Sequence, residues 1–208
     1  MDLFTTTNKR RANMKDYTHI CIVLDASGSM AAIESDTKGS FNSFLKEQKK
    51  AEGKTVFDLY QFSDQPRRVV EHVDLATFND DLMAKYRCSG CTALNDAVCT
   101  AIDTLGKEFS LMKEEDRPEH VMFVIITDGM ENASRKFSSE DVKKRIQEQT
   151  DVYKWDFQYL AANQDAFASG EMLGVSHDNC VTWHASKAGI ASVCGKMAAF
   201  ATKVRSKK

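Results

Sequence analysis

Two long apolar runs, each ending in an aspartate, constrain the fold of this chain more than any other feature. HICIVLD extends from His19 to Asp25, and VMFVIITD extends from Val121 to Asp128. Nearly continuous apolar strands are typical of a parallel sheet that is covered on both faces. The two runs therefore predict two central strands whose carboxyl ends carry acidic side chains.

Shorter strand patterns alternate with helical patterns along the rest of the chain. This alternation predicts a doubly wound α/β fold, a Rossmann-like three-layer sandwich with a central, mostly parallel sheet. A turn of the hairpin type at 63–66 separates two of the short strands. The further strands are expected over 55–62, 67–73, 155–162 and 179–182, and helices over 77–85, 93–113, 139–149, 164–173 and 187–204, with another helix around Phe41, Phe44 and Leu45.

Composition indicates a single domain of ordinary soluble character. The chain has 208 residues, 42% hydrophobic and 28% charged, with a net charge of −2. We expect a flexible arm over 1–16 and one domain over 17–205. The near-neutral charge disfavours nucleic-acid binding. No apolar run resembles a secretory signal or a membrane span, so we expect a cytoplasmic protein with no membrane partner.

Five oxygen-bearing side chains are expected to meet where the two central strands end. The first strand leads into Asp25-Ala26-Ser27-Gly28-Ser29, the second ends at Asp128, and Thr92 lies in the loop before the long helix. Ligands of open α/β sheets bind at this edge. Carboxylate and hydroxyl oxygens favour Mg²⁺ or Mn²⁺ over zinc. Two carboxylates neutralise the charge of a divalent ion but add no excess negative charge. The ion therefore stays electrophilic toward an incoming carboxylate.

The same residues carry a resemblance to the von Willebrand factor A family. The pattern D-x-S-x-S, then a threonine, then an aspartate is present as Asp25, Ser27, Ser29, Thr92 and Asp128, and the resemblance covers roughly 17–205. It is greatest to compact, stand-alone A-domain proteins of bacteria and their phages. The resemblance implies a strand order of 3-2-1-4-5-6 with one short antiparallel edge strand, and a metal-ion-dependent adhesion site. It implies protein binding rather than catalysis.

These inferences predict a partner protein that presents an Asp or Glu carboxylate to the bound cation. Residues that follow the same strand ends are expected to form a rim that contacts the partner. The exposed methionines of this rim would provide an adaptable surface. The predicted rim residues are Met30, Glu34, Met130, Glu131, Asn132 and Gln164.

Two other functions remain open at this point. One is a substrate-recruiting subunit of an AAA+ machine, which many bacterial A domains resemble, and the other is a phosphohydrolase that uses the same metal. A dehalogenase-like phosphatase needs a second carboxylate two residues after its nucleophile, where this chain has Ser27.

Cys88 and Cys91 form a single C-x-x-C that we interpret as two reduced thiols. The five histidines are scattered, and we interpret them as surface or strand-end residues.

Overall fold

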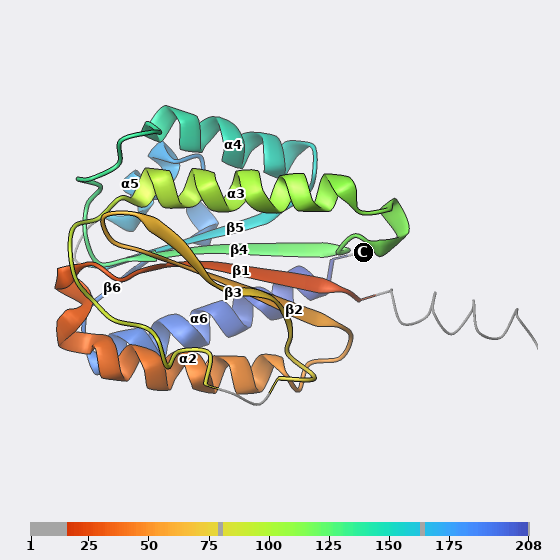
Figure 1. The fold of residues 1–208 in the computed structure, drawn as a ribbon, viewed down its shortest axis with the longest axis horizontal. Coiled ribbons are helices and arrows are strands. Elements are labelled where there is room, and N and C mark those ends of the chain that lie inside the picture. Colours follow the sequence, from red (N-terminus) through yellow and green to blue (C-terminus); the bar gives the residue numbers. More distant parts are fainter. Residues whose placement is uncertain (1–15, 79–80, 163–164, 208) are drawn as a thin grey trace, which may run out of the picture.

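The computed structural model describes residues 16–78, 81–162 and 165–207 and contains a six-stranded sheet in the order β3-β2-β1-β4-β5-β6 (Figure 1). Only the edge pair β2–β3 is antiparallel. The predicted fold class and strand order are confirmed. The strands are β1 (Thr18–Asp25), β2 (Thr55–Phe62), β3 (Pro66–Asp74), β4 (His120–Thr127), β5 (Asp156–Ala162) and β6 (Cys180–Trp183).

Helices cover both faces of the sheet and complete three layers (Figure 1). One face carries α2 and α6, and the other carries α3, α4 and α5. Short 3₁₀ helices η1 (Gly28–Ile33), η2 (Glu114–Asp116) and η3 (His177–Asn179) lie in the connections. The α-helices are α2 (Glu34–Gln48), α3 (Leu94–Leu111), α4 (Ser139–Asp151), α5 (Ala166–Met172) and α6 (Lys187–Arg205).

The central strands divide their apolar side chains between two cores. In β1, Ile20, Ile22 and Leu24 face α2 and α6, whereas Cys21 and Val23 face the α3 side. Every residue of β1 and β4 is buried. The period of two along a strand thus supplies both cores, which explains why the predicted strands lack polar alternation.

Local sequence determines where the helices begin. Ser138 accepts a hydrogen bond from the backbone N–H of Asp141, and the Asp141 side chain accepts one from the backbone of Ser138. This capping box begins α4 close to the predicted position. Asp165 caps α5 by accepting from the N–H groups of Phe167 and Ala168.

The predicted helix over 77–85 is wrong. Residues 75–77 and 82–85 form turns, and 79–80 lie outside the described residues. The carboxylate of Asp74 accepts from the N–H of Ala76, and that of Asp81 accepts from Met83. These local side-chain bonds compete with helical hydrogen bonds and favour turns. The predicted N-terminal arm also lies outside the described residues, apart from Asp16.

Within the described ranges, none of the helices combines the length and apolar character required to cross a bilayer.

Candidate metal centre at the carboxyl edge of the sheet

The two aspartates lie at the ends of neighbouring parallel strands. Asp25 is the last residue of β1, Asp128 directly follows β4, and Leu24 pairs with Ile126. Asp25 is fully buried, and Asp128 retains only 9% of its accessible surface. The sheet therefore holds two carboxylates side by side at its carboxyl edge, as the sequence predicts.

Hydroxyl groups connect the two strand ends. The Oγ atoms of Ser27 and Ser29 are 3.0 Å apart, and Ser29 Oγ donates to Asp128 Oδ1 at 2.6 Å. Asp25 Oδ1 accepts a 2.7 Å hydrogen bond from the Ser27 N–H. Four of the five predicted ligands thus form one continuous set of contacts.

Thr92 approaches this set from the loop before α3. A Cβ built on Gly129 would lie 3.4 Å from Thr92 Oγ1 and 3.8 Å from Ser29 Oγ. The absence of a side chain at Gly129 therefore leaves space between the two hydroxyls. Asn132 positions the threonine backbone, since its Oδ1 accepts from the Thr92 N–H and its own N–H donates to the Thr92 carbonyl.

Two further residues hold Asp25 and were not found by sequence reasoning. Thr127 Oγ1 donates to Asp25 Oδ2 at 2.6 Å, and the hydroxyl of Tyr86 donates to the Asp25 carbonyl at 2.6 Å. The side chains of Thr127 and Tyr86 are both fully buried. Thr127 could have been suspected because it immediately precedes Asp128. Tyr86 lies in an irregular segment and gives no sequence signal.

Backbone hydrogen bonds join the first loop of the site to the Thr92 loop. The Gly28 N–H donates to the Gly90 carbonyl, and the Ser89 N–H donates to the Ala26 carbonyl. Gly90 has a φ of +78°, and a Cβ there would collide with the carboxylate of Asp64. Glycine is consequently required at this close approach.

The site concentrates negative charge in a poorly solvated place. Burial raises the pKa of Asp25, against the opposing hydrogen bonds from Thr127 and Ser27. Burial also raises the pKa of Asp128, against the hydrogen bond from Ser29. Neither aspartate takes part in an ion pair with a basic side chain among the described residues. A cation would relieve this buried charge.

The donor set fits a hard divalent ion. All five candidate ligands offer oxygen, and two are carboxylates, which matches the preference of Mg²⁺ and Mn²⁺. The contacts between Ser27, Ser29 and Asp128 also show that the side chains converge. Asp25, Ser27, Ser29, Thr92 and Asp128 are therefore the residues that could hold such an ion.

The predicted rim is partly wrong. Met30 is fully buried in the core with α2, because η1 turns its side chain inward. Met130 is 75% exposed, as expected of a contact residue. The carboxylate of Glu131 accepts from the N–H groups of Asn95, Ala133 and Ser134, so it also holds its own loop.

The other rim residues differ in their accessibility. Glu34 is partly exposed and accepts from Lys38 Nζ and from the Cys88 N–H. Asn132 is exposed, although its side chain accepts the hydrogen bond from the Thr92 N–H. Gln164 lies outside the described residues. Cys88 is partly exposed and Cys91 is exposed, and the structure contains no disulfide between them.

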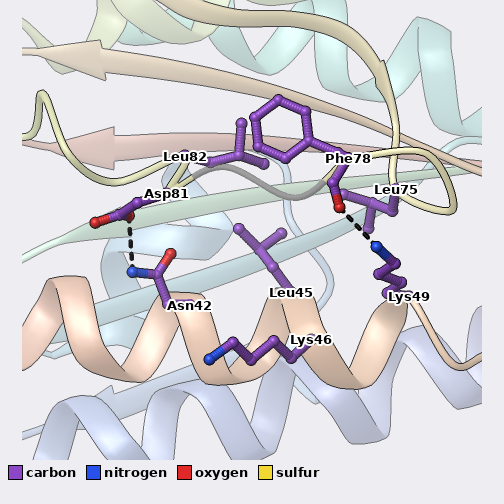
Figure 2. A pocket seen from close by; sticks show the side chains of 8 residues that line it. All are labelled: Asn42, Leu45, Lys46, Lys49, Leu75, Phe78, Asp81 and Leu82. Carbon is purple, nitrogen blue, oxygen red and sulfur yellow. Dashed lines mark hydrogen bonds between the residues drawn. The ribbon is translucent and has the colours of Figure 1, made fainter.

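A pocket of about 320 Å³ lies between α2 and the segment after β3 (Figure 2). Asn42 donates to Asp81 Oδ1 at 2.8 Å, and Lys49 Nζ donates to the Phe78 carbonyl at 2.7 Å. Figure 2 shows both bonds crossing the pocket from the helix to this segment. These polar groups fasten the segment to α2, and they supply no ligand to the carboxyl edge.

Comparison with known proteins now identifies the family. The model of the von Willebrand factor type A domain matches residues 19–165. The chain belongs to this family. No curated protein sequence matches the chain.

Several solved A domains share the fold. The vWF domain of the type V pili tip protein Mfa5 from Porphyromonas gingivalis is 10% identical, with a TM-score of 0.64 over 92% of this chain and 97% of that chain. Proximal thread matrix protein 1 from the mussel byssus, with a zinc-occupied MIDAS motif, is 14% identical, with a TM-score of 0.64 over 91% and 46%. A von Willebrand factor type A protein from Catenulispora acidiphila is 12% identical, with a TM-score of 0.59 over 88% and 42%. The chain thus spans less than half of the mussel and Catenulispora chains.

Proposed function

We propose that this A domain is a metal-dependent protein-binding module, in which Asp25, Ser27, Ser29, Thr92 and Asp128 hold Mg²⁺ or Mn²⁺. The observation that carries the proposal is the continuous set of contacts among Ser27, Ser29 and Asp128 beside the buried Asp25. The mussel protein, with its zinc-occupied MIDAS motif, supports the presence of a metal ion at this edge.

The bound ion would supply an electrophilic position for a hard oxygen of the partner. The two carboxylates neutralise the charge of the ion, and the three hydroxyl oxygens are only weak electron-pair donors to it. A further carboxylate, from an Asp or Glu of the partner, is therefore the ligand it would prefer. Ser29 is the exposed member of the set, so the partner would approach on its side.

The surroundings of Asp25 favour binding over catalysis. One of its oxygens accepts from Ser27 and the other accepts from Thr127. A carboxylate whose two oxygens are both held by donors is poorly suited to act as a nucleophile or as a general base. Ser27 stands where a phosphatase would need its second carboxylate, so we do not favour a phosphohydrolase.

The contact surface would centre on Met130. This side chain is exposed directly beside Gly129, while Asn132 and Glu131 add polar groups nearby. An apolar, flexible side chain at the centre of a polar rim is typical of an adaptable interface.

Affinity capture tests the proposal. The immobilised protein would recover a partner in Mg²⁺, and recovery would fall at least tenfold in chelator and with Thr92→Ala, which removes one hydroxyl from the site. Ser110→Ala, an exposed hydroxyl on α3, is the matched control and should recover as much as the wild type. Equal recovery by wild type and Thr92→Ala, with and without chelator, would show that the interaction does not use this metal.

Once the partner is known, its contact carboxylate can be identified. Replacing that Asp or Glu with Asn or Gln should abolish the dependence on Mg²⁺. A partner that binds through Mg²⁺ after all its surface carboxylates near the contact are neutralised would contradict the proposed bridge.

A further inference from the structure

A second cluster of potential metal ligands lies toward the amino ends of β1 and β2, on the face covered by α3. His19 is the second residue of β1, Asp58 lies in β2, and His72 lies in β3. His19 lies near the start of its strand, as expected, but it is not a surface residue, because its side chain is fully buried. This cluster shares no residue with the carboxyl-edge site.

An irregularity in β3 brings the third side chain into the cluster. Phe57 pairs with Val73 and Leu59 pairs with Val70, so β3 has one extra residue opposite Asp58. His72 lies within this bulge with a φ of +46°. Its backbone N–H lies 3.4 Å from Asp58 Oδ2, and bulges of this kind redirect side chains.

The potential ligand atoms converge. His19 Nε2 lies 2.8 Å from Asp58 Oδ2, and His72 Nδ1 lies 4.0 Å from the same oxygen. One ligand atom from each residue lies within 4.8 Å of one from each of the others. The side chain of His72 is 28% exposed, whereas those of His19 and Asp58 are fully buried. An ion could therefore enter past His72.

Each side chain is also held through an atom that does not face the others. His72 Nε2 lies 2.9 Å from Glu108 Oε2, and the Tyr17 hydroxyl lies 3.5 Å from His19 Nδ1. Arg68 Nε donates to Asp58 Oδ1 at 2.6 Å, which leaves Oδ2 to face the histidines. Metal-binding histidines characteristically have such partners on their second ring nitrogen.

The charges near the cluster permit a cation. Arg68 makes two hydrogen bonds to the carboxylate of Glu108, at 2.7 and 3.0 Å, in addition to its bond to Asp58. The guanidinium also lies 3.5 Å from the exposed carboxylate of Glu71, so one positive charge faces three carboxylates and the group carries net negative charge.

We propose that His19, Asp58 and His72 form a second metal site, which binds a transition metal such as Zn²⁺ and leaves one position open to solvent. Two imidazoles and a carboxylate favour zinc and its neighbours over Mg²⁺. The domain would then hold two ions of different chemistry, a hard ion at the carboxyl edge and a softer ion on the α3 face. Tyr17 and Glu108 orient the two imidazoles.

Calorimetry with Zn²⁺ alone as the ligand tests this site. The protein would carry Cys88→Ser and Cys91→Ser to remove the accessible thiols, and excess Mg²⁺ would fill the carboxyl edge. We expect His72→Asn to weaken Zn²⁺ binding at least tenfold, because asparagine tolerates the positive φ but removes the imidazole. His184→Asn, at an exposed histidine, is the matched control and should bind as the parent does.

Two further measurements separate this site from the carboxyl edge and from misfolding. Co²⁺ should give the intense visible absorption of a four- or five-coordinate nitrogen site, and this signal should survive Thr92→Ala but not His72→Asn. Glu108→Gln should weaken Zn²⁺ binding by about 10–100-fold, because a neutral amide replaces the charged carboxylate that orients His72. Unchanged Zn²⁺ binding in a folded His72→Asn protein, or no Zn²⁺ binding by the parent, would overturn the proposal.

Discussion

Replacing Thr127 with valine tests how Asp25 is held at the carboxyl edge. Valine keeps the shape and the strand preference of threonine but cannot donate the 2.6 Å hydrogen bond to Asp25 Oδ2. Both groups are fully buried, so the carboxylate oxygen would lose a donor that water cannot replace. A hydrogen bond to a charged group contributes about 1.5–3 kcal/mol to the free energy of unfolding.

For a chain of this size, that loss corresponds to a fall in Tm of roughly 3–12 °C. We expect this fall in thermal unfolding followed by circular dichroism in the presence of chelator. Mg²⁺ binding should also weaken, because the Asp25 carboxylate then keeps only the hydrogen bond from the Ser27 N–H. The hydroxyl of Thr18 has no hydrogen-bond partner among the described residues, so Thr18→Val is the matched control and should cost nothing. Equal Tm values for wild type and Thr127→Val would refute the role assigned to this contact.

Three further predictions concern the edge, the cores and the buried histidine. Met130→Lys should reduce partner capture at least fivefold with an unchanged circular dichroism spectrum, since Met130 is exposed beside the site; undiminished capture would move the interface elsewhere. Chelator should leave the protein folded at ambient temperature, because none of the five candidate ligands belongs to either apolar core; unfolding would show that the ion is structural. Burial lowers the pKa of His19 below 6.5, so the unfolded chain binds more protons, and in chelator the free energy of unfolding should fall as the pH falls below 6.5. The raised pKa values of Asp25 and Asp128 act in the opposite direction, so the comparison is made with His19→Gln, and an identical pH dependence in the two proteins would contradict a buried, neutral His19.

Much of the fold could be predicted because burial on both faces gives a strong sequence signal. The runs that end at Asp25 and Asp128 identified the two central strands, and the family resemblance implied the strand order that the structure contains. The five candidate ligands follow the ends of these strands or the adjoining loop. Their convergence could be predicted because parallel strands present their carboxyl ends at one edge.

The errors arise where local hydrogen bonds or cross-strand neighbours decide the structure. Around 77–85, the carboxylates of Asp74 and Asp81 accept hydrogen bonds from nearby backbone N–H groups, and turns form where a helix was expected. A 3₁₀ turn directed Met30 inward, although it directly follows an exposed serine. The cluster of His19 and His72 depends on a bulge opposite Asp58, which a single strand pattern does not reveal.

Anomalous scattering from crystals grown with Mn²⁺ locates the ion without reference to any partner. We predict one peak at the carboxyl edge, about 2.0–2.3 Å from Ser27 Oγ and Ser29 Oγ, with Thr92 and the two aspartates bound directly or through water. The same crystals of Asp128→Asn should show a weaker peak or none. A saturated crystal without an ion at this edge, or with an ion that does not contact the two serines, would contradict the proposed binding site.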